Sequence, residues 1–316
     1  MTTEAEPLPV GIPPISPSER VGTPVDGVTV LGSLSPSRAG DFMSCPLLYR
    51  FRTIDRLPEA PSVDAVRGTV VHKVLEDLFD LPAAERTPER AGEMVAPAWH
   101  ELLEATPDLG SLFPGEEGPD VAAWLASCRE SLRRYFTLED PRRLEPADRE
   151  LYVETLTDAK LLLRGIIDRV DVAPDGAIRI VDYKSGRGPS EAFEGKALFQ
   201  LKFYALVLWR VRGVVPRMLQ LVYLGSGEIL RYEPDEADLL ATERKVLAVW
   251  EAIQRARESG DWRPSPGPLC AWCSHKALCP AYGGTPPELP ERVSGRAAEA
   301  QPVVSTAGPG PGSSSG

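Results

Sequence analysis

The chain has 316 residues, the composition of a globular protein and a formal net charge of −11. Proteins that hold DNA by bulk electrostatics are normally basic, so this charge argues against a protein that merely coats nucleic acid. Any DNA path must then be a local basic groove or one screened by bound cations. No apolar run approaches the roughly 20 residues that cross a bilayer, which argues against a membrane protein.

The two ends of the chain differ in composition from its centre. The N-terminal segment 1–30 begins with a Pro-, Ser- and Glu-rich stretch, and the segment 283–316 ends in a Gly- and Ser-rich run, so we expect both to be disordered tails. The body between them, residues 31–282, shows no repeat and no linker. The N-terminus lacks the order of a signal peptide, so we expect a cytoplasmic protein whose five cysteines are metal ligands or spectators rather than disulfide partners.

The first half of the body is predicted to be helical. Ser35 is a plausible N-cap for a helix that continues through Leu47 and Leu48. After Gly68, apolar side chains recur at helical spacing in the run TVVHKVLEDLF. Residues 88–138 are predicted to form further helices around three aromatic residues, Trp99, Trp124 and Tyr135.

The second half of the body alternates strands and helices. We predict strands at 161–172 and 177–185, joined by a hairpin turn of sequence Ala-Pro-Asp-Gly. A strongly amphipathic helix at 194–211 follows, and then a second hairpin whose strands flank a Gly-Ser-Gly turn. A long helix from about Asp235 to Ser259 leads into a Pro-rich loop that carries three cysteines.

A carboxylate and a lysine end the predicted strand at 177–185. Side chains of a strand alternate between its faces, so Asp182 and Lys184 point the same way and Tyr183 points opposite. A carboxylate holds hard divalent cations, and a neighbouring lysine stabilises charge on a phosphate. A solvated ion pair is the simpler interpretation of these two residues alone. Asp168, in the apolar preceding strand, strengthens the metal interpretation, although a salt bridge to Arg164 or Arg169 is the alternative.

Two pairs of helical residues are weaker candidates. His72 and Glu76 lie four residues apart and share one side of their helix. A lone histidine on an apolar helix is more often a core residue than a ligand, but its imidazole could complete an Asp/Asp/His cation site. Gln200 and Tyr204 have the same spacing on the next helix, where they either pack at the surface or position substrate.

Three cysteines cluster near the end of the body, and a fourth lies more than 200 residues upstream. The spacing is C-x2-C-x5-C for the cluster, and the full set is Cys45, Cys270, Cys273 and Cys279. Four thiolates also suit zinc, for which His275 could substitute as a ligand, but structural zinc sites usually use two tight pairs. The three-plus-one arrangement better matches a four-cysteine iron–sulfur cluster. Cys128, within a helical stretch, is expected to be a core residue.

Taken in order, these fragments resemble the RecB-like nucleases of the PD-(D/E)xK superfamily, and within it the iron–sulfur subgroup that includes AddB-type nuclease domains and CRISPR-adaptation exonucleases. The resemblance runs through nearly the whole body. Its fragments are Leu34-Ser35-Pro36-Ser37, Cys45-Pro46, Arg67-Gly68-Thr69 with His72, Leu75 and Glu76, Gly165-Ile166-Ile167-Asp168-Arg169, Asp182-Tyr183-Lys184-Ser185-Gly186, Gln200 with Tyr204, and the three clustered cysteines.

The resemblance implies a role for each matched residue. His72, Asp168, Asp182 and the carbonyl of Tyr183 would hold Mg2+ or Mn2+. Lys184 would position and activate the attacking water, and Gln200 with Tyr204 would complete the catalytic set. The family usually has Glu where this chain has Asp182, and Asp is a variant of the same motif. Cys45, Cys270, Cys273 and Cys279 would hold a structural 4Fe-4S cluster.

The sequence therefore predicts an α/β fold with a restriction-endonuclease-like core, in which helices flank a central mixed β-sheet, an N-terminal helical region precedes it and a Cys-cluster C-terminal loop follows it. The resemblance implies a metal-dependent DNA exonuclease acting on single-stranded ends in repair or recombination. No helicase P-loop is present, so a motor would be a separate partner. The alternatives are a non-catalytic DNA-binding scaffold subunit of a helicase–nuclease complex and a zinc-stapled protein whose carboxylates form ordinary salt bridges.

Overall fold

A computed structural model describes residues 30–115, 119–186, 188 and 191–289. Nearly all of the expected N-terminal tail, residues 1–30, lies outside these ranges, as does most of the expected C-terminal tail, residues 283–316. Residues 283–289 are described, and the carbonyl of Pro287 accepts a hydrogen bond from the Arg50 guanidinium. No helix in the described ranges is long and apolar enough to span a membrane.

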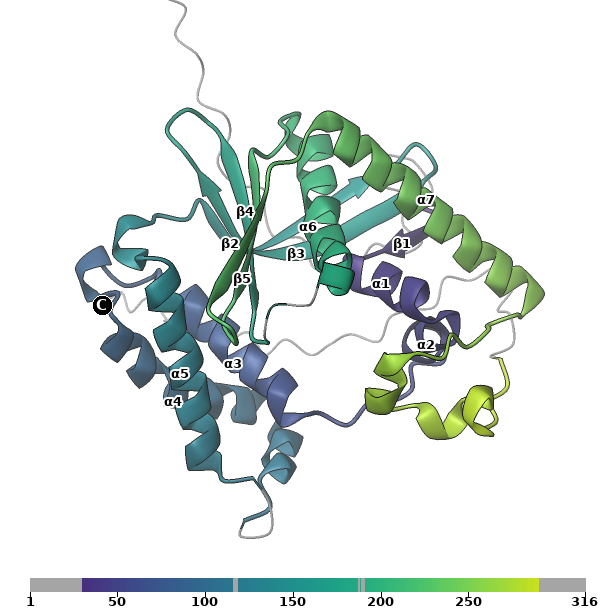
Figure 1. Cartoon of the computed structure of the whole chain (residues 1–316), viewed down its shortest axis with the longest axis horizontal. Helices are drawn as coiled ribbons and strands as arrows, with labels where there is room; N and C mark the ends of the chain where they lie inside the picture. The colour runs from purple at the N-terminus through teal and green to yellow at the C-terminus, as the bar shows by residue number, and fades with distance from the viewer. Residues whose placement is uncertain (1–29, 116–118, 187, 189–190, 290–316) are drawn as a thin grey trace, which may run out of the picture.

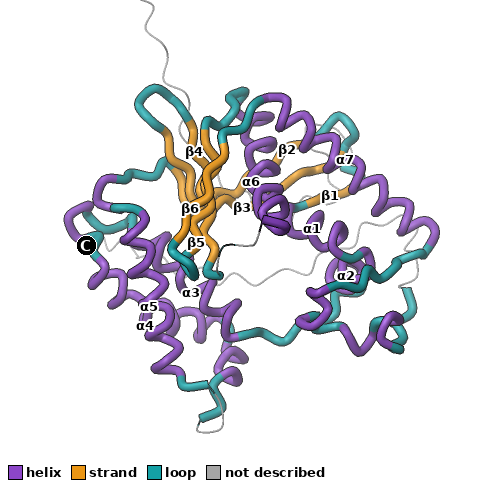
Figure 2. Tube along the Cα trace, in the orientation of Figure 1, coloured by secondary structure: helices purple, strands orange, loops and turns teal. Residues whose placement is uncertain are grey.

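A mixed sheet of six strands forms the centre of the described fold (Figures 1 and 2). The strand order is β1-β3-β4-β5-β6, and β2 pairs with the other edge of β3. The β1–β3 and β4–β5 pairs are parallel, whereas the β2–β3, β3–β4 and β5–β6 pairs are antiparallel. The strand bounds are β1 Gly32–Leu34, β2 Asp148–Leu156, β3 Leu161–Val172, β4 Ile178–Lys184, β5 Met218–Tyr223 and β6 Glu228–Tyr232.

Two groups of helices cover opposite faces of the sheet, as Figure 1 shows. One group packs with Val181, Tyr183 and Val222, and its members are α3 (Val63–Leu78), α4 (Pro88–Ala105) and α5 (Val121–Leu138). The other group packs with Ile180, Leu219 and Leu221, and its members are α1 (Pro36–Ser44), α2 (Pro46–Tyr49), α6 (Glu191–Arg212) and α7 (Glu236–Ser259). The sheet therefore separates two cores, and this agrees with the predicted α/β fold in which helices flank a mixed sheet.

Short helical segments connect the main elements. A π-helix, Arg50–Ile54, follows α2, and 3₁₀ turns occupy Ala83–Glu85, Pro107–Leu112 and Pro141–Arg143. Three more 3₁₀ turns, Pro268–Trp272, Lys276–Leu278 and Pro280–Tyr282, build the C-terminal loop that carries the clustered cysteines. This loop lies beside α2 in Figure 1.

Most predicted elements are present with their expected signals. Ser35 caps α1 by accepting the Arg38 N–H at 3.3 Å, and Asp235 caps α7. Both predicted hairpins form, β3–β4 and β5–β6. Two strands had no prediction: β1, which is very short, and β2, whose short apolar run is flanked on both sides by charged residues.

The first helix is shorter than predicted. It does not run through Leu47 and Leu48, because Cys45 adopts an extended backbone with φ of −163° and separates α1 from α2. Pro46 follows Cys45, and the ring of a proline disfavours helical geometry in the residue before it. The break turns Cys45 toward the C-terminal loop, so one local steric rule places the distant fourth cysteine.

The prediction of a strongly amphipathic helix at 194–211 is wrong in one respect. The helix exists as α6, but its apolar residues are not confined to one stripe: consecutive residues from Phe203 to Leu208 are all buried. A helix that is apolar on most sides must be covered on most sides. Here α6 lies between the sheet and the helices α1 and α7, and it contacts all of them.

Candidate active site and cysteine cavity

The candidate active site lies where β3 and β4 stop pairing. Their last paired residues toward this end are Arg169 and Val181, so Asp168 and Asp182 follow at the point where the ladder ends. The backbone N–H of Tyr183 donates to Asp168 Oδ2 at 2.7 Å. This bond satisfies a donor that β3 no longer serves, and it brings the two aspartates of the predicted site together.

Lys184 is held by its neighbours at the end of β4. Its Nζ lies 2.7 Å from Asp182 Oδ2 and donates to Gln200 Oε1 at 2.9 Å. The amide of Gln200 donates in turn to Asp182 Oδ1 at 2.9 Å and to the Tyr204 hydroxyl at 3.1 Å. Four residues that the sequence analysis placed in one site from separate motifs thus form one hydrogen-bonded network, because α6 crosses the end of β4.

Gly165 makes room for the last member of this network. A Cβ atom at this position would lie 2.5 Å from Cε1 of Tyr204, a distance that side chains do not tolerate. The absence of a side chain at Gly165 lets α6 approach β3 closely enough for Gln200 to reach β4. Gly165, at the start of the Gly165-Ile166-Ile167-Asp168 fragment, therefore makes room for Tyr204. Asp168, at its end, contributes a carboxylate to the site.

His72 reaches the site from α3. Its Nδ1 lies 3.5 Å from Asp168 Oδ2, and its ring meets the Tyr183 ring edge-on with centroids 6.0 Å apart. Burial lowers the pKa of His72, and a hydrogen bond to the backbone of Tyr183 offsets a small part of that effect. Glu76, which shares the His72 side of α3, lies beside Lys73.

Glu150 on β2 is a residue of this site that the sequence analysis missed. Potential ligand atoms of His72, Glu150 and Asp168 all lie within 4.8 Å of one another. No prediction existed for β2, and a single glutamate in an unassigned segment carries no motif. The only available signal was the alternation of Leu151 and Val153, which indicates a strand next to the predicted one at 161–172.

Burial and mutual repulsion dominate the electrostatics of the acidic residues. Burial, and then the charge of Asp182, raise the pKa of Asp168 to about 8. Burial also raises the pKa of Glu150, with Glu76 and Asp182 adding to the effect. Burial lowers the pKa of His72, which favours the neutral imidazole that binds metals. Carboxylates crowded in this way are stabilised by a bound cation, and their chemistry fits one.

Arg169 lies on the other face of the sheet. Its guanidinium is fully buried and forms a bidentate pair with Glu139, with N–O distances of 2.9 and 3.1 Å. It also contacts Asp171 and the hydroxyl of Tyr183. The alternative in which Asp168 pairs with Arg169 is therefore wrong, since Arg169 has other partners.

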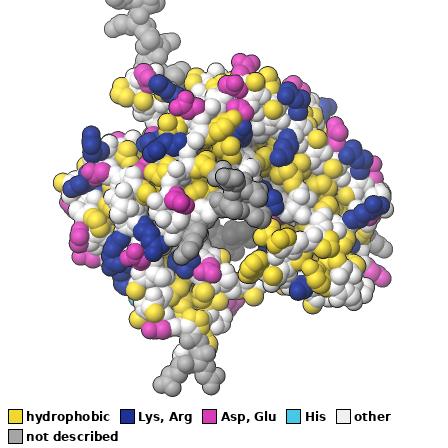
Figure 3. All heavy atoms as spheres, in the orientation of Figure 1, with side chains coloured by type: hydrophobic (Ala, Val, Ile, Leu, Met, Phe, Trp, Pro, Cys, Tyr) yellow, Lys and Arg dark blue, Asp and Glu magenta, His cyan; other side chains and the backbone are white. Residues whose placement is uncertain are grey.

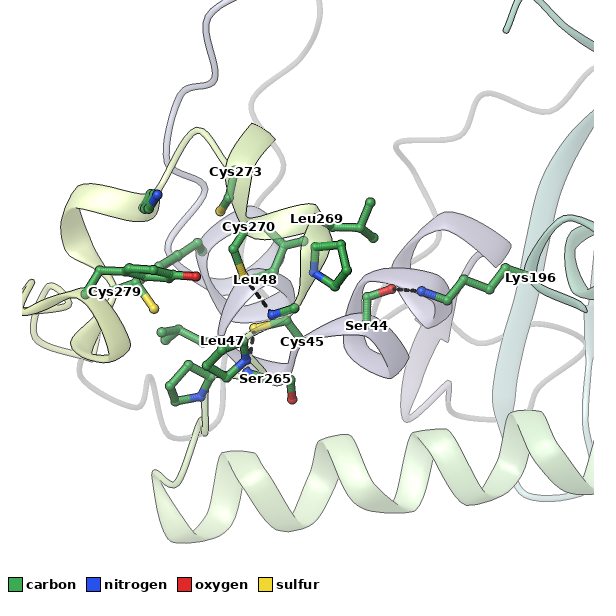
Figure 4. A pocket seen from close by; sticks show the side chains of 17 residues that line it. Ser44, Cys45, Leu47, Leu48, Lys196, Ser265, Leu269, Cys270, Cys273 and Cys279 are labelled. Carbon is green, nitrogen blue, oxygen red and sulfur yellow. Dashed lines mark hydrogen bonds between the residues drawn. The ribbon is translucent and has the colours of Figure 1, made fainter. Parts of the chain in front are cut away.

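The four predicted cluster ligands lie around one cavity of about 180 Å³. Figure 4 shows Cys45 from the start of α2 and Cys270, Cys273 and Cys279 from the C-terminal loop around a common space. The rest of the wall is mostly apolar, with the lysines Lys196 and Lys276. The structure thus brings together thiols that are separated by more than 200 residues of sequence.

Backbone donors point at two of the sulfurs. The N–H of Ser265 donates to Cys45 Sγ at 3.4 Å, and the N–H of Gly267 donates to Cys270 Sγ at 3.3 Å. The Gly267 donor, followed by Tyr282, lowers the pKa of Cys270. Such donors stabilise thiolates, the form in which cysteine binds metal. Within the described ranges no three of these sulfurs lie within 4.8 Å of one another.

His275 and Cys128, the other two residues that the sequence analysis considered beside these cysteines, do not line the cavity. His275 is buried, packs against Phe51 and has Nε2 2.9 Å from Glu59 Oε1, and it is not among the residues that line the cavity. Cys128 is fully buried in α5, where burial raises the pKa of its thiol to about 11. The prediction that Cys128 is a core residue is confirmed.

The outer surface near the cysteine cavity is apolar. Leu269, Trp272 and Tyr282 of the C-terminal loop expose large apolar side chains, and Trp272 is 79% exposed. Figure 3 shows hydrophobic side chains gathered over this part of the molecule, whereas basic and acidic side chains are interspersed over the rest of the visible face. The visible face therefore carries no continuous basic expanse, in keeping with the net charge.

Comparison with known proteins places this geometry among nucleases. Residues 33–280 match the model of the PD-(D/E)XK nuclease superfamily. The chain is 28% identical over 278 residues to the Gene 69 protein of Mycobacterium phage D29, which covers 78% of this chain and 96% of that protein. It is 24% identical over 295 residues to the Gene 69 protein of Mycobacterium phage L5, which covers 81% of this chain and 99% of that protein.

The fold is also found in a solved structure. It is a provisionally named exonuclease from Eubacterium rectale, which matches with a TM-score of 0.51 at 14% identity and covers 77% of this chain and 87% of its own. At that identity the similarity speaks for the fold alone. The family match spans the candidate active site and the cysteine loop up to Pro280.

Proposed function

The chain belongs to the PD-(D/E)XK nuclease superfamily, and on that premise we propose that it is a divalent-metal-dependent DNA exonuclease acting on single-stranded ends. The observation that carries the proposal is the network in which Gln200 holds Asp182 and Lys184 together at the end of β4. A carboxylate and an ammonium fixed side by side suit phosphodiester hydrolysis, in which a phosphate gains charge as it is attacked.

The residues present fit a divalent cation. Asp168, Asp182 and His72 offer two carboxylates and an imidazole that burial keeps neutral, and the Tyr183 backbone lies beside them. Oxygen ligands of this kind suit Mg2+ or Mn2+. Bound divalent cations polarise the scissile phosphate and lower the pKa of the attacking water.

The chain's own side chains supply the rest of the chemistry. Lys184 is partly exposed, with 31% of its side chain accessible, so its ammonium can reach a phosphate or a water while Asp182 and Gln200 fix its position. Tyr204 orients Gln200 through its hydroxyl. We assign Lys184 to positioning the attacking water and stabilising the phosphate charge, and Gln200 with Tyr204 to holding Lys184.

We further propose that Cys45, Cys270, Cys273 and Cys279 hold a 4Fe-4S cluster. The four thiols share one cavity, two receive backbone N–H donors, and two lysines of the wall offset thiolate charge. A tetrahedral zinc site with Zn–S bonds of about 2.3 Å brings its sulfurs to about 3.8 Å from one another. Among the described residues, no three of these sulfurs lie within 4.8 Å of one another, a spacing wider than zinc requires. His275, the possible substitute ligand, contacts Glu59 instead. Both observations support the larger iron–sulfur cluster.

The cluster joins the beginning of the nuclease body to its end. Cys45 precedes α2, whereas the other three ligands follow α7, so a bound cluster closes the chain across residues 31–282. We therefore propose that the role of the cluster is structural. The scaffold alternative has no use for the ordered contacts of Lys184, and we place the protein among active enzymes that could act beside a separate helicase in repair or recombination.

Cleavage of end-labelled single-stranded DNA tests the proposal. Anaerobically purified protein should shorten the strand with Mn2+ and not with EDTA, and Asp182→Asn should not shorten it under either condition. Loss of one end label before the other gives the polarity of digestion. Metal-independent cleavage, or full activity of Asp182→Asn, contradicts the assignment.

A further inference from the structure

The two strands that carry the aspartates of the candidate active site are not paired with each other at these residues. The last ladder pair of β3 and β4 toward the site is Arg169 with Val181, so Asp168 and Asp182 lie beyond it. Antiparallel strands owe their fixed separation to the hydrogen bonds between them. Beyond the ladder, other contacts must set the distance between the two carboxylates that are proposed to share a cation.

Tyr183 adjoins all three side chains of the proposed cation site. It follows Asp182 in the chain, and its backbone N–H donates to Asp168 Oδ2 at 2.7 Å. Its ring, which is buried, meets the His72 ring edge-on with centroids 6.0 Å apart. A shift of this one residue would therefore move the three proposed ligands relative to one another.

The hydroxyl of Tyr183 is held from the neighbouring strand. Nη1 of Arg169, the residue after Asp168, donates to this hydroxyl at 2.5 Å. The guanidinium carbon lies 5.6 Å from the centroid of the Tyr183 ring. The contact joins β3 to β4 through the residue that follows each aspartate, so side chains connect the two strands where the ladder ends.

Glu139 fixes the guanidinium of Arg169 in a single geometry. This residue ends α5 as its C-cap, and its carboxylate oxygens accept from Arg169 at 2.9 and 3.1 Å. Only 1% of the Arg169 side chain and 7% of the Glu139 side chain are exposed. A planar guanidinium paired with both oxygens of a carboxylate is fixed in direction as well as in distance. The end of α5 therefore determines where the Tyr183 hydroxyl lies.

Stability alone does not explain a buried ion pair at this place. The cost of removing two charges from water offsets most of their attraction, so such pairs contribute little net stability. Arg86 shows the structural use of the same device elsewhere in the chain. Its guanidinium pairs with Glu145 at 2.9 and 3.1 Å and donates to the carbonyls of Leu81 and Leu144, so it joins the segment after α3 to the segment after α5.

We propose that Arg169 and Glu139 are positioning residues of the candidate active site. By holding the Tyr183 hydroxyl, they fix the spacing of the three side chains that would bind a divalent cation. The inference rests on the proposed nuclease and deepens it, because it names two residues that act on the site through Tyr183. Partners that orient metal ligands in this way change metal affinity by about 10- to 100-fold.

The affinity of the full chain for Mn2+, measured by equilibrium dialysis, tests the inference without relying on cleavage. Tyr183→Phe removes only the hydroxyl and keeps the ring beside His72, so we expect the Kd for Mn2+ to rise about tenfold. Tyr232→Phe is the matched control, because the Tyr232 hydroxyl also contacts a cationic side chain, that of Lys202, at 2.9 Å. This control should leave the Kd unchanged.

Glu139→Gln replaces the bidentate carboxylate with an amide and should also raise the Kd for Mn2+. Glu145→Gln breaks the equivalent pair of Arg86 and should leave the Kd unchanged. The Tm of each variant, measured on the same samples, separates a loss of fold from a loss of position. At saturating Mn2+ we expect Tyr183→Phe to lower kcat and to leave the KM for DNA unchanged, because a misplaced cation impairs the transition state more than substrate binding.

Wild-type affinity for Mn2+ in both Tyr183→Phe and Glu139→Gln overturns the inference and leaves the nuclease intact. An equal rise of the Kd in the two control variants overturns it as well, because that result marks a general loss of structure. If the wild type binds Mn2+ but cleaves no DNA, the result counts against the nuclease alone, and the Kd values still decide the inference. A wild type that binds no Mn2+ removes the proposed cation site and the inference with it.

Discussion

The candidate active site and the cysteine cavity are built in opposite ways. The acidic residues and Lys184 stand on strands and helices of the central sheet, and hydrogen bonds among themselves fix most of them. The cysteines stand on a break between two helices and on a loop of 3₁₀ turns, and they surround a cavity of about 180 Å³. The first site is organised by the fold, whereas the cluster proposed for the second would itself join two distant parts of the fold.

The two regions meet on α6. Lys196 lines the cysteine cavity and donates to Ser44 at 3.2 Å, and Gln200, one turn later, holds Lys184. Four residues of helix span only about 6 Å. Displacement of the C-terminal loop is therefore expected to reach the catalytic network, although weakly, whereas a change in the network leaves the loop in place.

The largest expected effect is that of Asp182→Asn, which should impair the candidate active site and leave the cysteine cavity intact. Removing the charge deprives both Lys184 and the cation of a partner, so cleavage should fall by about 10³-fold or more. The colour of the cluster should persist, because Asp182 does not line the cysteine cavity. Asp175→Asn, at an exposed hairpin turn, is the matched control and should cleave like the wild type. Bleaching of Asp182→Asn would show that the two regions are not separable.

Cys270→Ser should impair the cysteine cavity and leave most of the candidate active site intact. The protein should lose its absorbance near about 400 nm, and the Tm should fall by about 4–8 °C, because the free energy of cofactor binding is also folding free energy. Cleavage should fall only about tenfold, through Lys196 and α6. Cys128→Ser is the control, since Cys128 is buried in α5 away from the cavity and its substitution should leave the colour unchanged. A coloured Cys270→Ser protein would remove the cluster assignment.

The sequence foretold those parts of the site that depend on local pattern. Strand alternation placed Asp182 beside Lys184, and helical spacing placed Gln200 beside Tyr204. Glu150 was not predicted, because its place beside His72 and Asp168 depends on a backbone that breaks the strand alternation on which the predictions rest. Pattern rules fail where a strand is strained, and strain is most common at the site itself.

The same limit applied to the helices. The break at Cys45 follows from Pro46, a rule available in the sequence but outweighed by the apolar run that continues through Leu47. The all-round burial of α6 could not be inferred, because it depends on α1 and α7 covering the sides that the sheet leaves open. Local geometry was thus predictable, whereas coverage by distant elements was not.

Gly165→Ala tests whether close packing of Tyr204 against β3 is needed in the candidate active site. The new Cβ would lie 2.5 Å from Tyr204, so the ring must move and loosen Gln200. Overpacking of this kind costs about 1–3 kcal/mol, and cleavage should fall about tenfold with the cluster unaffected. Gly40→Ala on α1, where a Cβ meets no atom within 4 Å, should be neutral or slightly stabilising. Stability and activity measured together on both variants give the test, and a fully active Gly165→Ala would mean that Tyr204 does not hold Gln200.

The smallest expected effect is a pH dependence of stabilisation by Mg2+, which arises on the catalytic side alone. Burial beside Asp182 raises the pKa of Asp168 from 3.8 to about 8 when no cation is bound. Since the folded-state pKa exceeds the ordinary value, protonation favours the folded state. The free energy of unfolding without metal should therefore fall as the pH rises from about 4 to about 8.

Mg2+ requires the ionised carboxylate, so it should offset this loss at high pH and do little at low pH. We expect saturating Mg2+ to raise the Tm by at least about 2 °C more at about pH 8.5 than at about pH 6. Asp168→Asn should abolish the difference, whereas Cys270→Ser should retain it from a lower starting Tm. An equal Mg2+ effect at both pH values would mean that the crowded carboxylates do not receive the cation. In that case only the cysteine cavity would remain as a proposed metal-dependent part of the fold.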